Sequence, residues 1–142
     1  MLKFNRKTEY GVIALRYLAA QQKPGVMVSA REISDTYKIP YPILSKVLQQ
    51  LHLHGMINSV QGTKGGYTLK VPLESLTLAQ LVEIFEGPLG VTDCMNAHQA
   101  CFLNDHCNVK GVFHNINKKI AEMLQSITLK EMKGGHRDHH NR

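Results

Sequence analysis

The chain has 142 residues, of which 43% are hydrophobic, and it carries a formal net charge of +6. This length fits one domain with an extension, and this composition supplies a core, so a globally disordered chain is excluded. No apolar run is long enough to span a bilayer, and no apolar stretch follows the charges of the first seven residues. We therefore expect a protein of the cytoplasm that neither crosses a membrane nor carries a secretory signal.

The positive charge is concentrated in the first half of the chain. Residues 1–70 hold ten Lys or Arg against three acidic residues, whereas residues 71–142 hold seven against eight. A one-sided excess of this kind is typical of a surface that binds nucleic acid or an anionic membrane. A solubilising surface would give the same charge, so charge alone does not decide the partner.

Three helices are predicted in the first part of the chain, over residues 5–22, 29–37 and 41–54. Apolar residues recur at helical spacing in the first, and a capping sequence that runs from Ser29 to Glu32 opens the second. The third helix ends at Gly55. Its expected buried stripe is formed by Leu44, Val47, Leu48 and Leu51.

A β-hairpin follows the third helix. Its expected strands cover residues 56–60 and 67–71, and the glycine-rich turn 61–66 joins them. Three helices followed by a hairpin is the order of a winged helix-turn-helix, so the expected class is mainly α with a small hairpin (α+β). A nucleotide-binding P-loop is disfavoured because that motif joins a strand to a helix.

In a winged helix-turn-helix the second of two short helices lies in the major groove, so the helix that begins at Tyr41 is the expected recognition helix. The hairpin turn is the expected wing, in which glycines let the backbone approach DNA and Lys64 supplies charge. Polar side chains on the exposed face suit base edges or phosphates. The predicted contacts to double-stranded DNA are Tyr41, Pro42, Ser45, Lys46, Gln49, Gln61, Thr63 and Lys64.

The chain divides into four predicted parts, and a capped helix at 77–86 ends the first of them. The DNA-binding domain covers residues 1–87, and a cysteine-rich loop covers 88–107. A long helix over 108–126 and a short helix opened at Thr128 make up a dimerisation unit, 108–133, and a disordered tail follows at 134–142. The predicted apolar dimer seam is Val109, Val112, Phe113, Ile116, Ile120, Met123 and Leu124.

Three cysteines, Cys94, Cys101 and Cys107, lie within 14 residues, and the chain has no others. An odd, clustered set in a cytosolic chain indicates metal binding or redox activity rather than a disulfide framework. The spacings are wider than those of a zinc knuckle and suit an iron–sulfur cluster, but spacing alone does not separate the two. A cysteine enzyme is the less favoured alternative, because no base and oxyanion site can be identified, and no small-molecule substrate is expected.

The stretch Thr8-Glu9-Tyr10-Gly11-Val12, the wing 62–67 and the triple-cysteine loop together resemble one family of bacterial regulators. It is the family of the iron–sulfur cluster regulator (IscR), the nitric-oxide-sensitive repressor (NsrR) and the rhizobial iron regulator (RirA), and the resemblance covers about residues 1–132. It implies a homodimer, crossed through the long helix, that binds a palindromic promoter site as a repressor. It also implies a 4Fe-4S or 2Fe-2S cluster whose response to nitric oxide, oxygen, redox state or iron changes DNA affinity. A zinc- or thiol-based regulator of the same fold stays the alternative.

The resemblance also bears on the fourth ligand of such a cluster. The IscR-like pattern has a histidine three residues after the last cysteine, where this chain has Lys110, whose ammonium cannot ligate. The NsrR-like pattern takes an acidic residue from the N-terminal region of the partner subunit, and Glu9 matches that position. The rival ligands by proximity are His98, His106 and His114.

Overall fold

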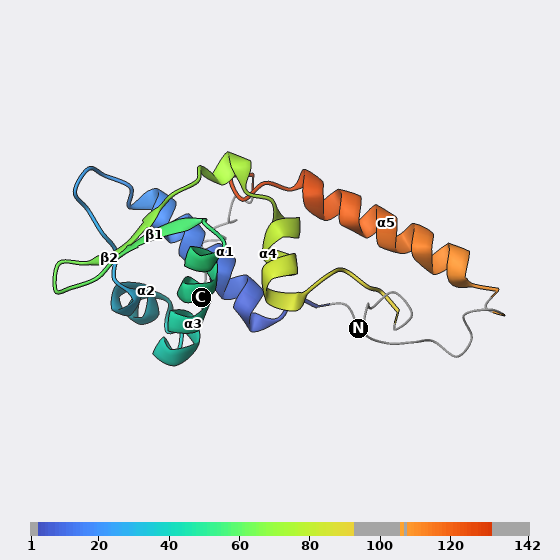
Figure 1. Ribbon diagram of the computed structural model, residues 1–142, viewed down its shortest axis with the longest axis horizontal. Coiled ribbons are helices and arrows are strands. Elements are labelled where there is room, and N and C mark those ends of the chain that lie inside the picture. The colour runs from blue at the N-terminus through green and yellow to red at the C-terminus, as the bar shows by residue number, and fades with distance from the viewer. Residues whose placement is uncertain (1–2, 93–105, 107, 132–142) are drawn as a thin grey trace, which may run out of the picture.

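The computed structural model describes residues 3–92, 106 and 108–131. In Figure 1, α1 runs through the centre of the body, α2 and α3 lie together below it, and the hairpin extends to one side. Helix α4 stands between this body and α5, which projects away from it. The elements are α1 (Arg6–Ala20), α2 (Ala30–Tyr37), α3 (Tyr41–Leu53), β1 (Ile57–Val60), β2 (Gly66–Leu69), the 3-10 helix η1 (Leu73–Ser75), α4 (Leu78–Glu86) and α5 (Lys110–Ser126).

Side-chain caps fix where three of the helices begin. The Asn5 side chain accepts a hydrogen bond from the Thr8 N–H (2.9 Å), and the Ser29 hydroxyl accepts one from the Glu32 N–H (3.1 Å). The capping box at Thr77 is complete, since Gln80 also accepts from the Thr77 N–H (2.9 Å). These bonds satisfy N–H groups that a helix leaves free in its first turn, so the predicted starts agree with the structure within about one residue.

The expected stripe of α3 lies in the core. Its four side chains are fully buried, with Leu15 of α1 and Ile33 of α2 among their neighbours in one cluster. The hairpin pairs in antiparallel register, with Ile57 opposite Leu69. The α+β class and the order of helices and hairpin are therefore confirmed.

The Thr8–Val12 stretch is fixed to the end of α4. Thr8 is buried, and its hydroxyl donates to the Glu86 carboxylate (2.5 Å), while the Asn5 amide donates to the Phe85 carbonyl (3.1 Å). A Cβ on Gly11 would lie 2.7 Å from the Phe85 ring, so only glycine fits there without a shift of that ring. Contacts with α4 thus explain why Thr8 and Gly11 occupy their positions, and the sequence alone does not reveal these contacts.

The wing glycines have an internal reason as well. The backbones of Val28 and Tyr67 exchange two hydrogen bonds (3.0 and 2.7 Å), which adds a third short strand segment to the hairpin. A Cβ on Gly65 would overlap the Val60 carbonyl, and one on Gly66 would lie 2.7 Å from the Val28 carbonyl oxygen. Close packing within the wing therefore gives these two glycines a structural reason of their own, and the approach of their backbone to DNA stays a prediction.

We expect Gly65→Ala to destabilise the protein by about 1–3 kcal/mol, because the added methyl group meets backbone that cannot rotate away. Thr63→Ala in the same turn is the matched control, since Thr63 is exposed, and we expect a change of at most about 0.5 kcal/mol. Urea unfolding measures both. Equal midpoints for Gly65→Ala and the parent would contradict this packing.

The short helix predicted to open at Thr128 is wrong for the described residues 128–131: Thr128 forms an antiparallel bridge with Thr77, and residues 129–131 form a turn. The backbone there pairs with the segment before α4: the Leu129 N–H donates to the Leu76 carbonyl, and the Leu78 N–H donates to the Ile127 carbonyl (both 2.9 Å). Leu129 is fully buried in the core. These long-range bonds use groups that a local helix would have needed.

Candidate nucleic-acid interface and cysteine segment

A short, well-fixed turn joins α2 to α3. Lys38 ends α2 in the left-handed conformation (φ 57°), and the Ser34 hydroxyl donates to the Ile39 carbonyl (2.6 Å). Ile39 is buried, and Pro40 precedes the first residue of α3. The turn therefore holds the two helices in a fixed mutual orientation, as a helix-turn-helix requires.

The predicted DNA-contacting residues lie on two surfaces. Helix α3 carries Tyr41, Pro42, Lys46 and Gln49 as exposed residues and Ser45 as a half-buried one, on the sides away from its buried stripe. The hairpin turn carries Gln61, Thr63 and Lys64, all exposed. The arrangement leaves these polar side chains open to a ligand, and their contacts with DNA stay a prediction.

One contact at this surface was not predicted. The guanidinium carbon of Arg31, on α2, lies 4.5 Å from the centroid of the Tyr41 ring at the start of α3. The sequence gives no signal for it, because the two residues belong to different helices and meet only through the turn.

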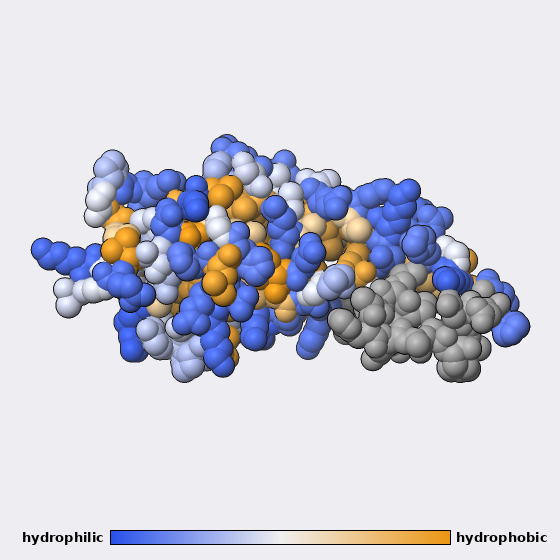
Figure 2. All heavy atoms as spheres, in the orientation of Figure 1, coloured by the Kyte–Doolittle hydropathy of each residue, from blue (hydrophilic) through white to orange (hydrophobic). Residues whose placement is uncertain are grey.

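The apolar stripe of α5 has two surroundings. Leu124 is buried against Leu78 and Val82 of α4, and Ile120 is partly buried in the same cluster. The seam prediction is therefore wrong for Leu124, which the chain covers itself. The side of α5 visible in Figure 2 is mostly hydrophilic, as expected for a one-sided stripe. The stripe residues that stay exposed, at 38–60%, are Val109, Val112, Phe113, Ile116 and Met123.

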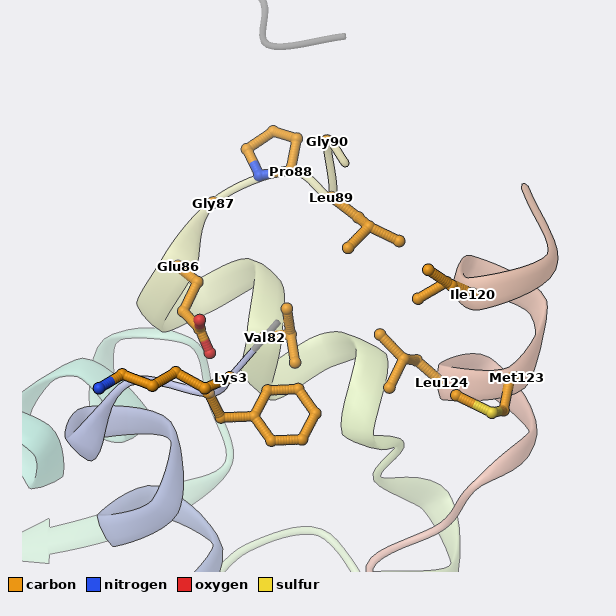
Figure 3. A pocket seen from close by; sticks show the side chains of 11 residues that line it. Lys3, Val82, Glu86, Gly87, Pro88, Leu89, Gly90, Ile120, Met123 and Leu124 are labelled. Atoms are coloured by element: carbon orange, nitrogen blue, oxygen red, sulfur yellow. The ribbon is translucent and has the colours of Figure 1, made fainter. Parts of the chain in front are cut away.

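A cleft of about 570 Å³ lies beside this helix, between α4, α5 and the segment before α1 (Figure 3). Phe4, Val82, Leu89, Ile120 and Met123 give it a mainly apolar lining. The cleft adjoins the exposed stripe of α5 on the side of α4, so the apolar surface of this part of the molecule consists of the exposed stripe together with the cleft.

The three cysteines and His98 lie outside the described residues, so their predicted grouping is not tested. Both described flanks of their segment adjoin α5: the Val91 N–H donates to the Asn117 side chain (3.2 Å), and Val109 is the N-cap of the helix. His106 and His114 are exposed. Among the residues that the structure describes, no group of three or more His, Cys, Asp or Glu is placed to hold a metal ion.

Glu9 lies in the first turn of α1 and is exposed. Its carboxylate pairs with the Arg6 guanidinium at 2.8 Å, and the Glu9 side chain is 44% exposed. Lys110, at the position of the histidine in the IscR-like pattern, is the first residue of α5. Glu9 is therefore accessible to a partner molecule, provided that its pairing with Arg6 is exchanged.

A family model described as "Rrf2: Iron-dependent Transcriptional regulator" matches residues 4–134. The chain belongs to the Rrf2 family. This confirms the resemblance, and it makes the protein a DNA-binding transcriptional regulator rather than an enzyme. In the described part of this Rrf2 regulator, no helix has the length and apolar character needed to cross a bilayer.

Individual relatives agree with this assignment. The regulator NsrR of Shouchella clausii is 32% identical over 126 residues, which cover 88% of this chain and 84% of the relative. The structure of CymR, the global cysteine regulator of B. subtilis, matches with a TM-score of 0.71 at 25% identity and covers 92% of this chain and 95% of its own. The T. potens IscR structure matches with 0.68 at 29% identity, covering 92% and 85%.

Proposed function

We propose that this Rrf2 regulator is a cytoplasmic, homodimeric repressor that senses its signal through an iron–sulfur cluster held by Cys94, Cys101 and Cys107. The observation that carries the proposal is the placement of all three cysteines in one segment whose described flanks both adjoin α5. A segment attached to the expected dimer helix is well placed to couple a bound group to the arrangement of two subunits.

The donor chemistry fits such a cluster. Thiolates are soft ligands that suit iron–sulfur clusters, and three of them in a short segment repel one another unless a cation binds them. Three cysteine thiolates leave one coordination position of the cluster without a protein ligand, and Glu9 of a second subunit is the proposed fourth ligand. When bound, the cluster supplies a redox-active centre that reacts with oxidants or nitric oxide.

Ligation by Glu9 would couple the cluster to the DNA-binding helices. It lies on α1, whose buried face packs against the recognition helix α3 in the core. A bond from Glu9 to the partner subunit's cysteine segment ties the DNA-binding part of one subunit to α5 of the other. Loss of that bond frees the two recognition helices to change their spacing, which is a shift between two arrangements of the dimer.

The test is an anaerobic purification followed by an absorbance spectrum and by iron and sulfide analysis. We expect a brown protein that contains iron and acid-labile sulfide. A colourless protein that binds zinc, or that has only titratable thiols, would overturn the cluster and favour the thiol- or zinc-based regulator. Colour and metal content do not depend on the promoter, so the test needs no knowledge of the target gene.

The wing gives a second prediction. Lys64 is exposed in the hairpin turn, so we expect it to contact a DNA phosphate. Lys64→Ala should weaken binding to all duplexes alike and reduce the slope of log affinity against log salt by about one, because one fewer counterion is released. Fluorescence anisotropy at several salt concentrations measures both quantities.

Lys118→Ala removes an equal charge from the exposed surface of α5 and is the matched control. It should leave the salt slope within error of the parent. An unchanged affinity and slope for Lys64→Ala would show that the wing does not touch DNA. Substitutions at Ser45 or Lys46 should instead alter which sequence is preferred, since they lie on the recognition helix.

A further inference from the structure

We propose that Arg31 contacts a DNA phosphate and that the Tyr41 ring holds its guanidinium in position at the start of the recognition helix. The inference rests on the DNA-binding role of α3. It adds a contact from α2 to that surface and gives Tyr41 a positioning role.

The geometry places the pair where two helices meet. Arg31 is the second residue of α2, Tyr41 is the first residue of α3, and the guanidinium lies 4.5 Å from the ring centroid. Arg31 is exposed, and Tyr41 is 40% exposed, so the contact lies at the surface. In helix-turn-helix complexes the first helix crosses the DNA backbone while the N-terminal residues of the second reach the bases. This pair occupies the junction between those two regions.

The donors of Arg31 remain free for a ligand. Within the described residues the one ion pair is Arg6–Glu9, and none of the hydrogen bonds or ion pairs there involves the Arg31 side chain. The acidic residues nearest to Arg31 on α2, Glu32 and Asp35, form no ion pair with it in the described part of the chain. The positive charge of Arg31 is thus not paired with a carboxylate among the residues that the structure describes.

The chemistry of the pair favours a phosphate. A guanidinium stacked on an aromatic face keeps its N–H donors directed outward in one plane, and this planar fork matches phosphate oxygens. Stacking also restricts a long side chain that would otherwise sample many rotamers, so less freedom is lost when the phosphate binds. Lysine supplies the same charge without the fork or the planar stack.

The experiment measures DNA affinity of the full chain, purified anaerobically, for two 30-base-pair duplexes. One is selected from a random library by the parent protein, and the other is a scrambled duplex of the same composition. Arg31→Ala should weaken binding to both by about tenfold, as expected for a charge-assisted hydrogen bond, and lower the salt slope by about one. Arg31→Lys should restore the slope but only part of the affinity.

A double-mutant cycle tests the positioning role of Tyr41. Tyr41→Phe keeps the ring and should keep the contribution of Arg31, whereas Tyr41→Leu removes the stacking surface and should weaken binding. The double variant Arg31→Ala/Tyr41→Leu should bind at most about twofold more weakly than Arg31→Ala alone. The reason is that losses of binding free energy are not additive for two residues that act as one unit. Fully additive losses would overturn the positioning role.

The other outcomes separate this inference from the DNA-binding surface itself. If Lys46→Ala and Lys64→Ala lose affinity while Arg31→Ala does not, the Arg31 contact is wrong and the surface stands. If none of the three loses affinity, the surface on α3 and the wing is wrong, and the Arg31 contact with it. If Arg31→Ala weakened binding to the selected duplex alone, the phosphate contact would be wrong and Arg31 would contact a base instead. Thermal unfolding of each variant checks that it is folded.

Discussion

Val112→Asp combined with Ile116→Asp should convert the protein from a dimer to a monomer of 16.0 kDa in light scattering. The two side chains are 60% and 41% exposed on the stripe of α5, and an apolar stripe on one side of a helix normally packs against another element. If a second copy covers them, two aspartates in each subunit place four carboxylates in an apolar interface. Burial of unpaired charge is costly enough to prevent association.

The same double variant should lose about 100-fold or more in operator affinity. Two linked recognition helices bind two half-sites with the gain of a tethered second contact, and a monomer loses that gain. Because both positions are exposed in the single chain, the monomer should keep its helical circular dichroism. Loss of affinity with retained fold is therefore the expected signature.

The choice of positions depends on the structure. Ile120 and Leu124 belong to the sequence stripe but pack against α4, so aspartate there would unfold the subunit and give no information on the dimer. Lys118→Asp, on the hydrophilic side of α5, is the matched control and should stay dimeric. A double variant that remained a dimer would rule out this part of α5 as the seam.

The helices and the hairpin were predictable because their signals are local. Capping residues such as Thr77 and the apolar spacing of α3 act within a few residues, and the structure agrees with both. The stripe of α5 was also visible in the sequence, but periodicity does not say which neighbour covers it. Leu124 shows the consequence, since α4 buries it although the pattern assigned it to a partner subunit.

Contacts between distant segments could not be predicted. Residues 128–131 form a bridge and a turn instead of a helix because their backbone pairs with residues about fifty positions earlier in the chain, and this pairing overrides a local capping sequence. Thr8 and Gly11 likewise owe their places to Glu86 and Phe85 at the end of α4. The Thr8–Val12 stretch is one of the motifs by which the sequence resembles the family. In the structure it attaches α1 to α4, the helix that precedes the cysteine segment.

Cys101→Ala and Glu9→Ala should have different effects on the proposed cluster. Removal of a thiolate from three leaves too few soft ligands, so Cys101→Ala should purify without iron and without visible absorbance. Glu9→Ala should retain iron, because all three thiolates remain, but with an altered spectrum and an altered rate of reaction with nitric oxide or oxygen. A carboxylate is the harder ligand of the set, and its position is the one that a small molecule would enter first.

The environment of Glu9 provides the control for that comparison. Its carboxylate pairs with Arg6 at 2.8 Å on an exposed surface, where an ion pair contributes at most about 1 kcal/mol, so neither Glu9→Ala nor Arg6→Ala should unfold the protein. Arg6→Ala breaks the same pair and leaves the carboxylate in place. It should therefore keep the parent spectrum, whereas Glu9→Ala should not. If the two variants changed alike, the ion pair would be responsible rather than ligation. If Glu9→Ala matched the parent in spectrum, reactivity and DNA response, Glu9 would be excluded, and His98, His106 and His114 would be the ligands to test next.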